Sequence, residues 1–169
     1  EFPADPGASR THRFSSDVSF DRIVGLYVFD RKLRLLVLEA MERIEVSVRT
    51  QWASELSVRT DTAHPHLDPS MFKDFRTHVK DLHRLVQEVE RSGEVFVKHY
   101  SDHYSEPGLP PIWACVETMS LGALSQWIKN TRHTETKKAL MRSLGLPTVE
   151  ILEKVLHTLT PVRNVCAHH

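Results

Sequence analysis

The sequence predicts an all-α protein built as one domain. Apolar residues recur at helical spacings of three and four, and no segment alternates convincingly between apolar and polar residues as a strand does. Clusters of proline, glycine, serine and aspartate separate most of the periodic segments. The 169 residues, 40% of them hydrophobic, are enough for one domain with a sizeable core.

A long helix is expected from Ser19 to about Arg59. Residues 1–18 are rich in turn-forming residues and predict a loop or extended segment that leads into it. The stretch that follows contains no proline and one glycine, Gly25, and Ser19 can cap it; two helices joined near residues 28–30 would also fit. Apolar residues lie both in one stripe and outside it, so this helix should be packed on more than one side and form the spine of the fold. The stripe consists of Leu26, Phe29, Leu33, Leu36, Val37, Ala40, Ile44 and Val48.

Three shorter helices are expected in the middle of the chain. Asp68 or Ser70 can cap a helix over about residues 70–91, which the Ser-Gly pair after it ends. A short helix follows over residues 94–104, before the turn-rich sequence SEPGLPP. Pro111 can then open another helix at its first position, where a missing N–H does no harm.

The C-terminal third continues the helical pattern. The sequences IWACVETMS and LGALSQWIKN predict two short helices hinged at Leu121-Gly122. Thr134 can cap the next helix, and Gly145 can close it. The last helix is expected to start near Thr148 and to run to the end, with a kink at Pro161.

The charge balance argues against binding of nucleic acid through net charge alone, because 22 Lys and Arg face 22 Asp and Glu. Residues 120–169 nevertheless hold seven Lys or Arg against three Glu, a balance of +4. The two cysteines, Cys115 and Cys166, are too few for a disulfide framework and suit a reducing cytosol. No apolar run approaches the roughly 20 residues of a membrane span, and no signal-peptide pattern is present. We therefore expect a cytoplasmic protein.

The last nine residues, PVRNVCAHH, place an arginine, an asparagine and two histidines on about two helical turns. In a helix, Asn164 and His168 share a face because they are four residues apart, and Arg163 lies on the flank. A histidine can take or give a proton at cellular pH, and an arginine can bind a phosphate and stabilise charge developing on it. RNA supplies its own nucleophile, the 2′-OH, so this set predicts metal-independent RNA cleavage without a cofactor. The acid and base steps need two groups, and a symmetric dimer would supply the second.

Three stretches carry a resemblance to a known family. They are SFDRIVGLYVFDRKLRLLVLEAMERIEVSVRTQ (residues 19–51), PPIWACVETMSLGALSQW (residues 110–127) and the terminal VRNVCAHH. The last looks like the R-N-x-x-x-H signature of the HEPN superfamily, many of whose members are metal-independent ribonucleases. Within that superfamily, the chain resembles the bacterial Abi-like (abortive infection) proteins.

The resemblance implies a HEPN-type helical bundle with a long central helix over residues 19–169, preceded by residues 1–18 as the entry segment of a truncated N-terminal region. It places Arg163, Asn164 and His168 in the composite cleft of a homodimer. It implies an RNA-cleaving or RNA-binding toxin-like protein of phage defence or of a toxin–antitoxin system, with a protein or RNA antitoxin as its inhibitor. Family members usually extend past the final histidines, so the last helix is expected to continue.

Other interpretations of the motif stay open. The same residues can form a polar helix end with a histidine near the negative end of the helix dipole. The domain can also be a non-catalytic RNA-binding or dimerisation module, in which the arginine and asparagine only grip phosphate. His169 is expected in a supporting role and Cys166 as a small packed residue. A metal-dependent enzyme is a third alternative, since the 11 histidines include close pairs such as His99 and His103, but no complete ligand set accompanies them.

The long helix also carries acidic residues four positions before basic ones, a spacing that predicts helix-supporting ion pairs. The pairs are Asp30–Arg34, Glu39–Arg43 and Glu45–Arg49. A part-buried ladder of charges could instead orient Arg163 or line a dimer cleft, which makes Arg34, Arg43, Glu45 and Arg49 candidate supporting or RNA-binding residues. The tryptophans Trp52, Trp113 and Trp127 are expected in the core rather than as stacking platforms for bases.

Overall fold

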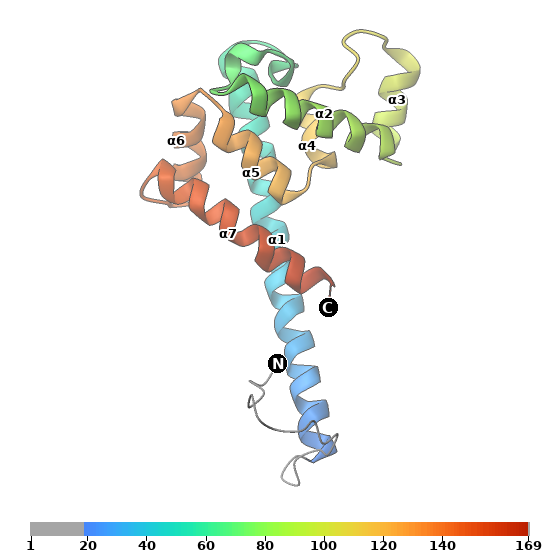
Figure 1. Cartoon of the computed structure of the whole chain (residues 1–169), viewed down its shortest axis with the longest axis vertical. Coiled ribbons are helices and arrows are strands. Elements are labelled where there is room, and N and C mark those ends of the chain that lie inside the picture. The colour runs from blue at the N-terminus through green and yellow to red at the C-terminus, as the bar shows by residue number, and fades with distance from the viewer. Residues whose placement is uncertain (1–18, 169) are drawn as a thin grey trace, which may run out of the picture.

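The computed structural model describes residues 19–168, and the regular elements in this part of the chain are all helical (Figure 1). The prediction of an all-α fold is confirmed. The α-helices are α1 (Phe20–Thr60), α2 (Phe75–Arg91), α3 (Val95–His103), α4 (Ile112–Thr118), α5 (Leu121–Asn130), α6 (Thr134–Ser143) and α7 (Val149–His168). Two short 3₁₀ turns, η1 (Pro65–Leu67) and η2 (Pro69–Met71), connect α1 to α2.

The spine of the fold is a single helix, so the alternative of two joined helices is wrong. Helix α1 has 41 residues, and the Ser19 side chain caps it by accepting a hydrogen bond from the Arg22 N–H at 3.3 Å. It ends at Asp61, which takes a left-handed conformation with φ 50° and whose N–H donates to the Ser57 carbonyl. Such a residue closes a helix by satisfying one of its last carbonyls.

Helix α1 is packed mainly over its C-terminal half. There α4, α6 and α7 contact it, and its buried apolar residues are Met41, Val48, Trp52, Ala53 and Leu56. The N-terminal half projects beyond the other helices (Figure 1). The expected burial of the whole apolar stripe is therefore wrong: Leu26, Phe29, Leu33 and Leu36 are between 47% and 68% exposed. The described part of the chain contains no helix that covers them.

Aromatic side chains form the centre of the core. The Trp52 and Trp127 rings lie 6.1 Å apart, and the Phe72 ring meets that of Trp127 edge-on at 5.1 Å. The buried Trp52 Nε1–H donates to the Thr131 hydroxyl at 3.1 Å, so its polar atom is satisfied. Burial of Trp52 and Trp127 is confirmed, but Trp113 is 55% exposed.

Several helix boundaries differ from the expected ones because a neighbouring residue supplies the cap. Asp74 caps α2, accepting from the Thr77 N–H at 2.7 Å, whereas Asp68 caps the 3₁₀ turn η2 through the Ser70 N–H at 2.8 Å. Helix α2 therefore begins at Phe75 rather than at residue 70.

Small shifts of the same kind affect α4, α5 and α6. Pro111 is the N-cap of α4 rather than its first residue. Ser120 caps α5 by accepting from the Ala123 N–H at 3.2 Å, so the hinge lies just before Leu121. Thr134 is the first residue of α6, and His133 precedes it without a side-chain capping bond.

Helix α7 is held at both ends of its packed part. Gly145 closes α6 with φ +65°, as predicted, and the Thr148 hydroxyl accepts from the Ile151 N–H at 3.2 Å to start α7. Close contact with α5 follows one turn before the motif, where a Cβ added to Gly122 would lie 3.1 Å from the Thr160 methyl group. The helix then continues through Pro161 to His168.

Candidate functional site

The candidate site lies on the last two turns of α7, where this helix crosses α1 at the point where α1 leaves the packed body (Figure 1). Asn164 and His168 are both exposed. Residues four apart in a helix are separated by about 40° around its axis, so the two side chains share one solvent-facing side. The prediction that Asn164 and His168 share a face of the helix agrees with this arrangement.

Arg163 lies on a different side of α7. It follows the buried Leu156 by seven residues, which places it within about 20° of that core residue and about 140° from His168 on an ideal helix. It is half-buried, as expected for this inner side. Within one chain the guanidinium therefore flanks the inner side of the helix and does not converge directly with the imidazole.

The three motif side chains make no bonds to other side chains in the described structure. Among residues 19–168, no side-chain hydrogen bond or ion pair engages Arg163, Asn164 or His168. The neighbouring apolar residues Val162 and Val165 are 40% and 57% exposed. Asn164 and His168 thus lie on the exposed side of the last turns of α7, next to the uncovered half of α1, while Arg163 lies on the inner side.

The buried acid–base pair on α1 has another structural role. Arg49 bonds to Glu45 at 2.9 Å and donates to the Met119 carbonyl at 2.8 Å, at the C-terminus of α4. Its second nitrogen lies 3.8 Å from Glu117. A guanidinium at the negative end of a helix dipole is stabilising, so this pair ties α4 to α1. Neither side chain makes a hydrogen bond or an ion pair with Arg163 in the described structure.

The other predicted charge pairs of α1 are also formed. Arg34 bonds to Asp30 at 2.9 Å with a side chain that is 15% exposed, and Arg43 bonds to Glu39 at 2.7 Å with one that is 79% exposed. The helix-supporting interpretation of all three pairs is therefore confirmed at the level of geometry. The remaining candidate, His169, lies outside the described residues.

The core near the η1 turn contains buried histidines that were not predicted from the sequence. His66 is fully buried, and its Nε2 lies 3.6 Å from the buried Cys115 Sγ, while the His78 Nε2 lies 2.8 Å from the His66 carbonyl oxygen. Burial, with smaller effects of His64 and His78, lowers the pKa of His66 to about 3. Burial raises the pKa of Cys115 to about 12. Both groups are therefore neutral near neutral pH, as packed core residues are.

The histidine pairs are also engaged in other contacts. The His99 and His103 rings lie 4.2 Å apart, and the His103 Nδ1 lies 2.8 Å from the His99 carbonyl oxygen. Within residues 19–168, no group of three or more His, Cys, Asp or Glu side chains is arranged to hold a metal ion. The same residues contain no helix both long enough and apolar enough to cross a bilayer.

Comparison with known proteins gives a family but no individual relative. No curated protein and no solved structure matches the chain. The family described as "Abi-like protein" matches residues 2–169, which include the spine helix and the terminal motif. The chain thus belongs to the Abi-like protein family, a membership that suggests a role in abortive infection.

Proposed function

We propose that this protein is a metal-independent endoribonuclease of a bacterial abortive-infection or toxin–antitoxin system, with a HEPN-type site at Arg163, Asn164 and His168. The observation that carries the proposal is the exposed pair of Asn164 and His168 on one side of α7, free of bonds to other described residues and beside a half-buried arginine. These groups are available to a ligand rather than committed to the fold.

The chemistry needs proton transfer and charge stabilisation only. One imidazole removes the proton of a 2′-OH, whose oxygen attacks the adjacent phosphorus, while the bond to the 5′-oxygen breaks. The leaving 5′-oxygen takes up a proton from an acid. The products are a 2′,3′-cyclic phosphate and a 5′-OH. Arg163 stabilises the negative charge that grows on the phosphate oxygens, and Asn164 orients the phosphate or the imidazole.

A second copy of the chain completes the site in this proposal. One chain offers one described histidine at the motif, and its arginine lies on another side of the helix. The apolar residues on the projecting half of α1, such as Phe29 and Leu36, are exposed. An exposed apolar surface of this kind is typical of an interface. A two-fold axis near the α1–α7 crossing would bury it and bring two motifs together.

RNA cleavage in the presence of EDTA tests the proposal. The wild type should cut RNA, and His168→Ala should cut at least 100-fold more slowly, because a general acid or base contributes about 10²–10⁴-fold. His83→Ala, which removes an exposed histidine of α2, is the matched control and should cut like the wild type. Equal rates for His168→Ala and the wild type would show that the assignment is wrong.

A non-catalytic RNA-binding or dimerisation module is the second candidate. The position of Arg163, about 140° from His168 around α7, favours it, because the three side chains do not converge in one chain. Toxicity on induced expression separates the two candidates. A nuclease loses toxicity with His168→Ala, whereas a binding module keeps it. In either case the partner that restrains the protein in the cytoplasm would be a cognate protein or RNA antitoxin.

A further inference from the structure

A groove lined by basic side chains lies between the N-terminal half of α7 and the neighbouring helices α5 and α6, away from the terminal motif. It consists of two adjoining hollows of about 600 and 330 Å³, both bordered by Glu150 and Glu153. We call it the basic groove and define it by its cationic and titratable basic residues. They are Lys73, Lys129, Lys137, Lys138, Arg142, Lys154 and His157.

The interior of the basic groove holds the buried ammonium of Lys137 beside the carboxylate of Glu153. Lys137 is 2% exposed, and its Nζ donates to the Lys129 carbonyl at 2.7 Å and to Glu153 at 2.8 Å. Burial lowers the pKa of Lys137 to about 8, and the nearby Lys73 ammonium acts in the same direction against the opposing effect of Glu153. The Glu153 carboxylate therefore lies near two cations, the buried Lys137 and the exposed Lys73, which leaves positive charge for an external anion.

The rim of the groove adds further positive charge. Lys73, Lys129, Arg142 and Lys154 are exposed and make no ion pair with another described residue, whereas Lys138 is paired with Glu135 at 2.8 Å. The six Lys and Arg of the groove face two lining carboxylates. The excess of basic residues in residues 120–169 is therefore gathered largely at this groove. Cations at this density are typical of surfaces that track a phosphate backbone.

The groove and the motif share one side of α7. Lys154, His157, Pro161, Asn164 and His168 follow one another at spacings of three and four, and all five are exposed. They therefore form a continuous line along the solvent-facing side of the helix. At about 1.5 Å per residue, the line from Lys154 to His168 is about 21 Å long. At the roughly 3.4 Å spacing of a stacked strand, about six nucleotides would span it.

We propose that the basic groove binds the sugar–phosphate backbone of the RNA substrate, about six nucleotides from the bond held at the motif. This inference rests on the proposed function. The groove contributes affinity without reading sequence, because lysine and arginine bind phosphates here rather than base edges. The bound RNA would run along α7 from the basic groove to His168. A long RNA therefore reaches cations of the groove that a very short RNA cannot reach.

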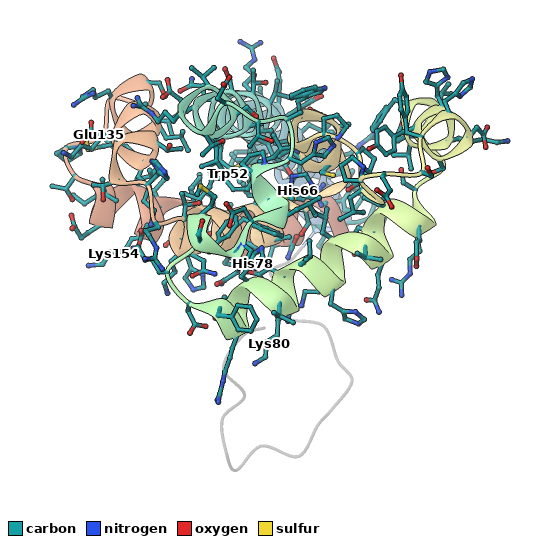
Figure 2. All side chains as sticks on the ribbon, turned by 90° about the horizontal axis from the view of Figure 1, so that it is seen from above. Trp52, His66, His78, Lys80, Glu135 and Lys154 are labelled. Atoms are coloured by element: carbon teal, nitrogen blue, oxygen red, sulfur yellow. The ribbon has the colours of Figure 1, made fainter. Side chains whose placement is uncertain are left out.

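Binding of a labelled 20-nucleotide RNA to the His168→Ala protein, which should leave the RNA uncut, tests the groove. In that background, Lys73→Gln with Lys154→Gln should weaken binding at least ten-fold. The slope of log affinity against log salt should become shallower by about 1.4, since each phosphate of a single strand that a cation neutralises contributes about 0.7 to it. Lys80→Gln with Lys98→Gln removes the same charge from exposed positions of α2 and α3 and is the matched control. Lys80 lies on α2, apart from Lys154 (Figure 2).

The groove variant and the control variant must differ for the inference to stand. Equal affinities for the two double variants would show that only net charge matters, and would overturn it. An unchanged affinity of the groove variant would overturn it as well.

Cleavage of two lengths of RNA separates this inference from the proposed function. In the otherwise wild-type chain, the groove variant should cut a dinucleotide at the wild-type rate and the 20-nucleotide RNA more slowly. If the groove variant cuts each RNA at the wild-type rate, the groove inference would be wrong and the proposed nuclease function would still hold. If the wild type cuts neither RNA but still binds RNA through the groove, the proposed nuclease function would be wrong and the groove inference would still hold.

Discussion

The buried His66 should make the fold sensitive to acid, and the size of the effect follows from its pKa. In the folded chain burial lowers this pKa to about 3, from the ordinary value of 6.5. Below pH 6.5 the unfolded chain therefore binds a proton that the folded chain does not. The stability is full above pH 6.5 and falls as the pH drops toward 3. Between pH 7.5 and pH 5.0 the loss is about 2 kcal/mol, at about 1.4 kcal/mol per pH unit below 6.5.

Urea unfolding of His66→Leu isolates this contribution. The leucine does not titrate, and it leaves behind only a weak sulfur partner, because the Cys115 Sγ already lies 3.1 Å from the Pro110 carbonyl oxygen. The drop in the free energy of unfolding between the two pH values should be about 2 kcal/mol smaller for His66→Leu than for the wild type. With a slope of about 2 kcal/mol per molar urea, this corresponds to about 1 M in the midpoint.

An exposed histidine provides the control for the same measurement. His83→Leu removes an exposed imidazole from α2 and should keep the wild-type difference between pH 7.5 and pH 5.0. A His66→Leu protein that loses as much stability in acid as the wild type would refute the reasoning. His66 would then not be held neutral by the core.

Three further predictions concern the packing of α1, α5 and α7. Arg49→Ala should lower the free energy of unfolding by about 3 kcal/mol in chemical unfolding, because it leaves the buried Glu45 carboxylate without its cation. Arg43→Ala should lower it by less than about 1 kcal/mol, because the Arg43 side chain is exposed. Equal losses would contradict the role of Arg49 in tying α4 to α1. Gly122→Val should displace α7, lower stability by about 1–3 kcal/mol and slow RNA cleavage, since even a Cβ there meets α7 at 3.1 Å. A variant as stable and active as the wild type would show that α7 is not held at this contact. Leu36→Glu should shift the protein from dimer to monomer in sedimentation velocity without lowering the stability of the monomer, because this side chain is 66% exposed; an unchanged sedimentation coefficient would contradict the dimer surface.

Spacing in the sequence predicted the helices and the i,i+4 ion pairs because both depend on local geometry. It was less accurate for caps, since Asp68, Ser70 and Asp74 all lie within a short stretch and compete for the start of α2. Prolines at the first positions of η1 and η2 favour the short turns that occupy the space before Phe75. The selected cap depends on tertiary contacts such as the Asp74 N–H bond to the Asn130 side chain at 2.9 Å.

Periodicity identified the apolar stripe of α1 but could not say what covers it. Leu36 and Val48 belong to the same stripe, yet only Val48 lies where other described helices pack. The shared face of Asn164 and His168 followed from their spacing alone. The inner position of Arg163 depends on which side of α7 is buried, and counting back seven residues to Leu156 would have indicated it. The low pKa of His66 could not be predicted, because its burial depends on helices far apart in the sequence.

The ends of the RNA fragments test the central proposal most directly. After incubation of RNA with the wild type in EDTA, mass spectrometry should find 2′,3′-cyclic phosphate and 5′-hydroxyl ends, and it should find almost none with His168→Ala. Fragments with 3′-hydroxyl and 5′-phosphate ends, or cleavage that EDTA abolishes, would contradict transesterification by Arg163, Asn164 and His168.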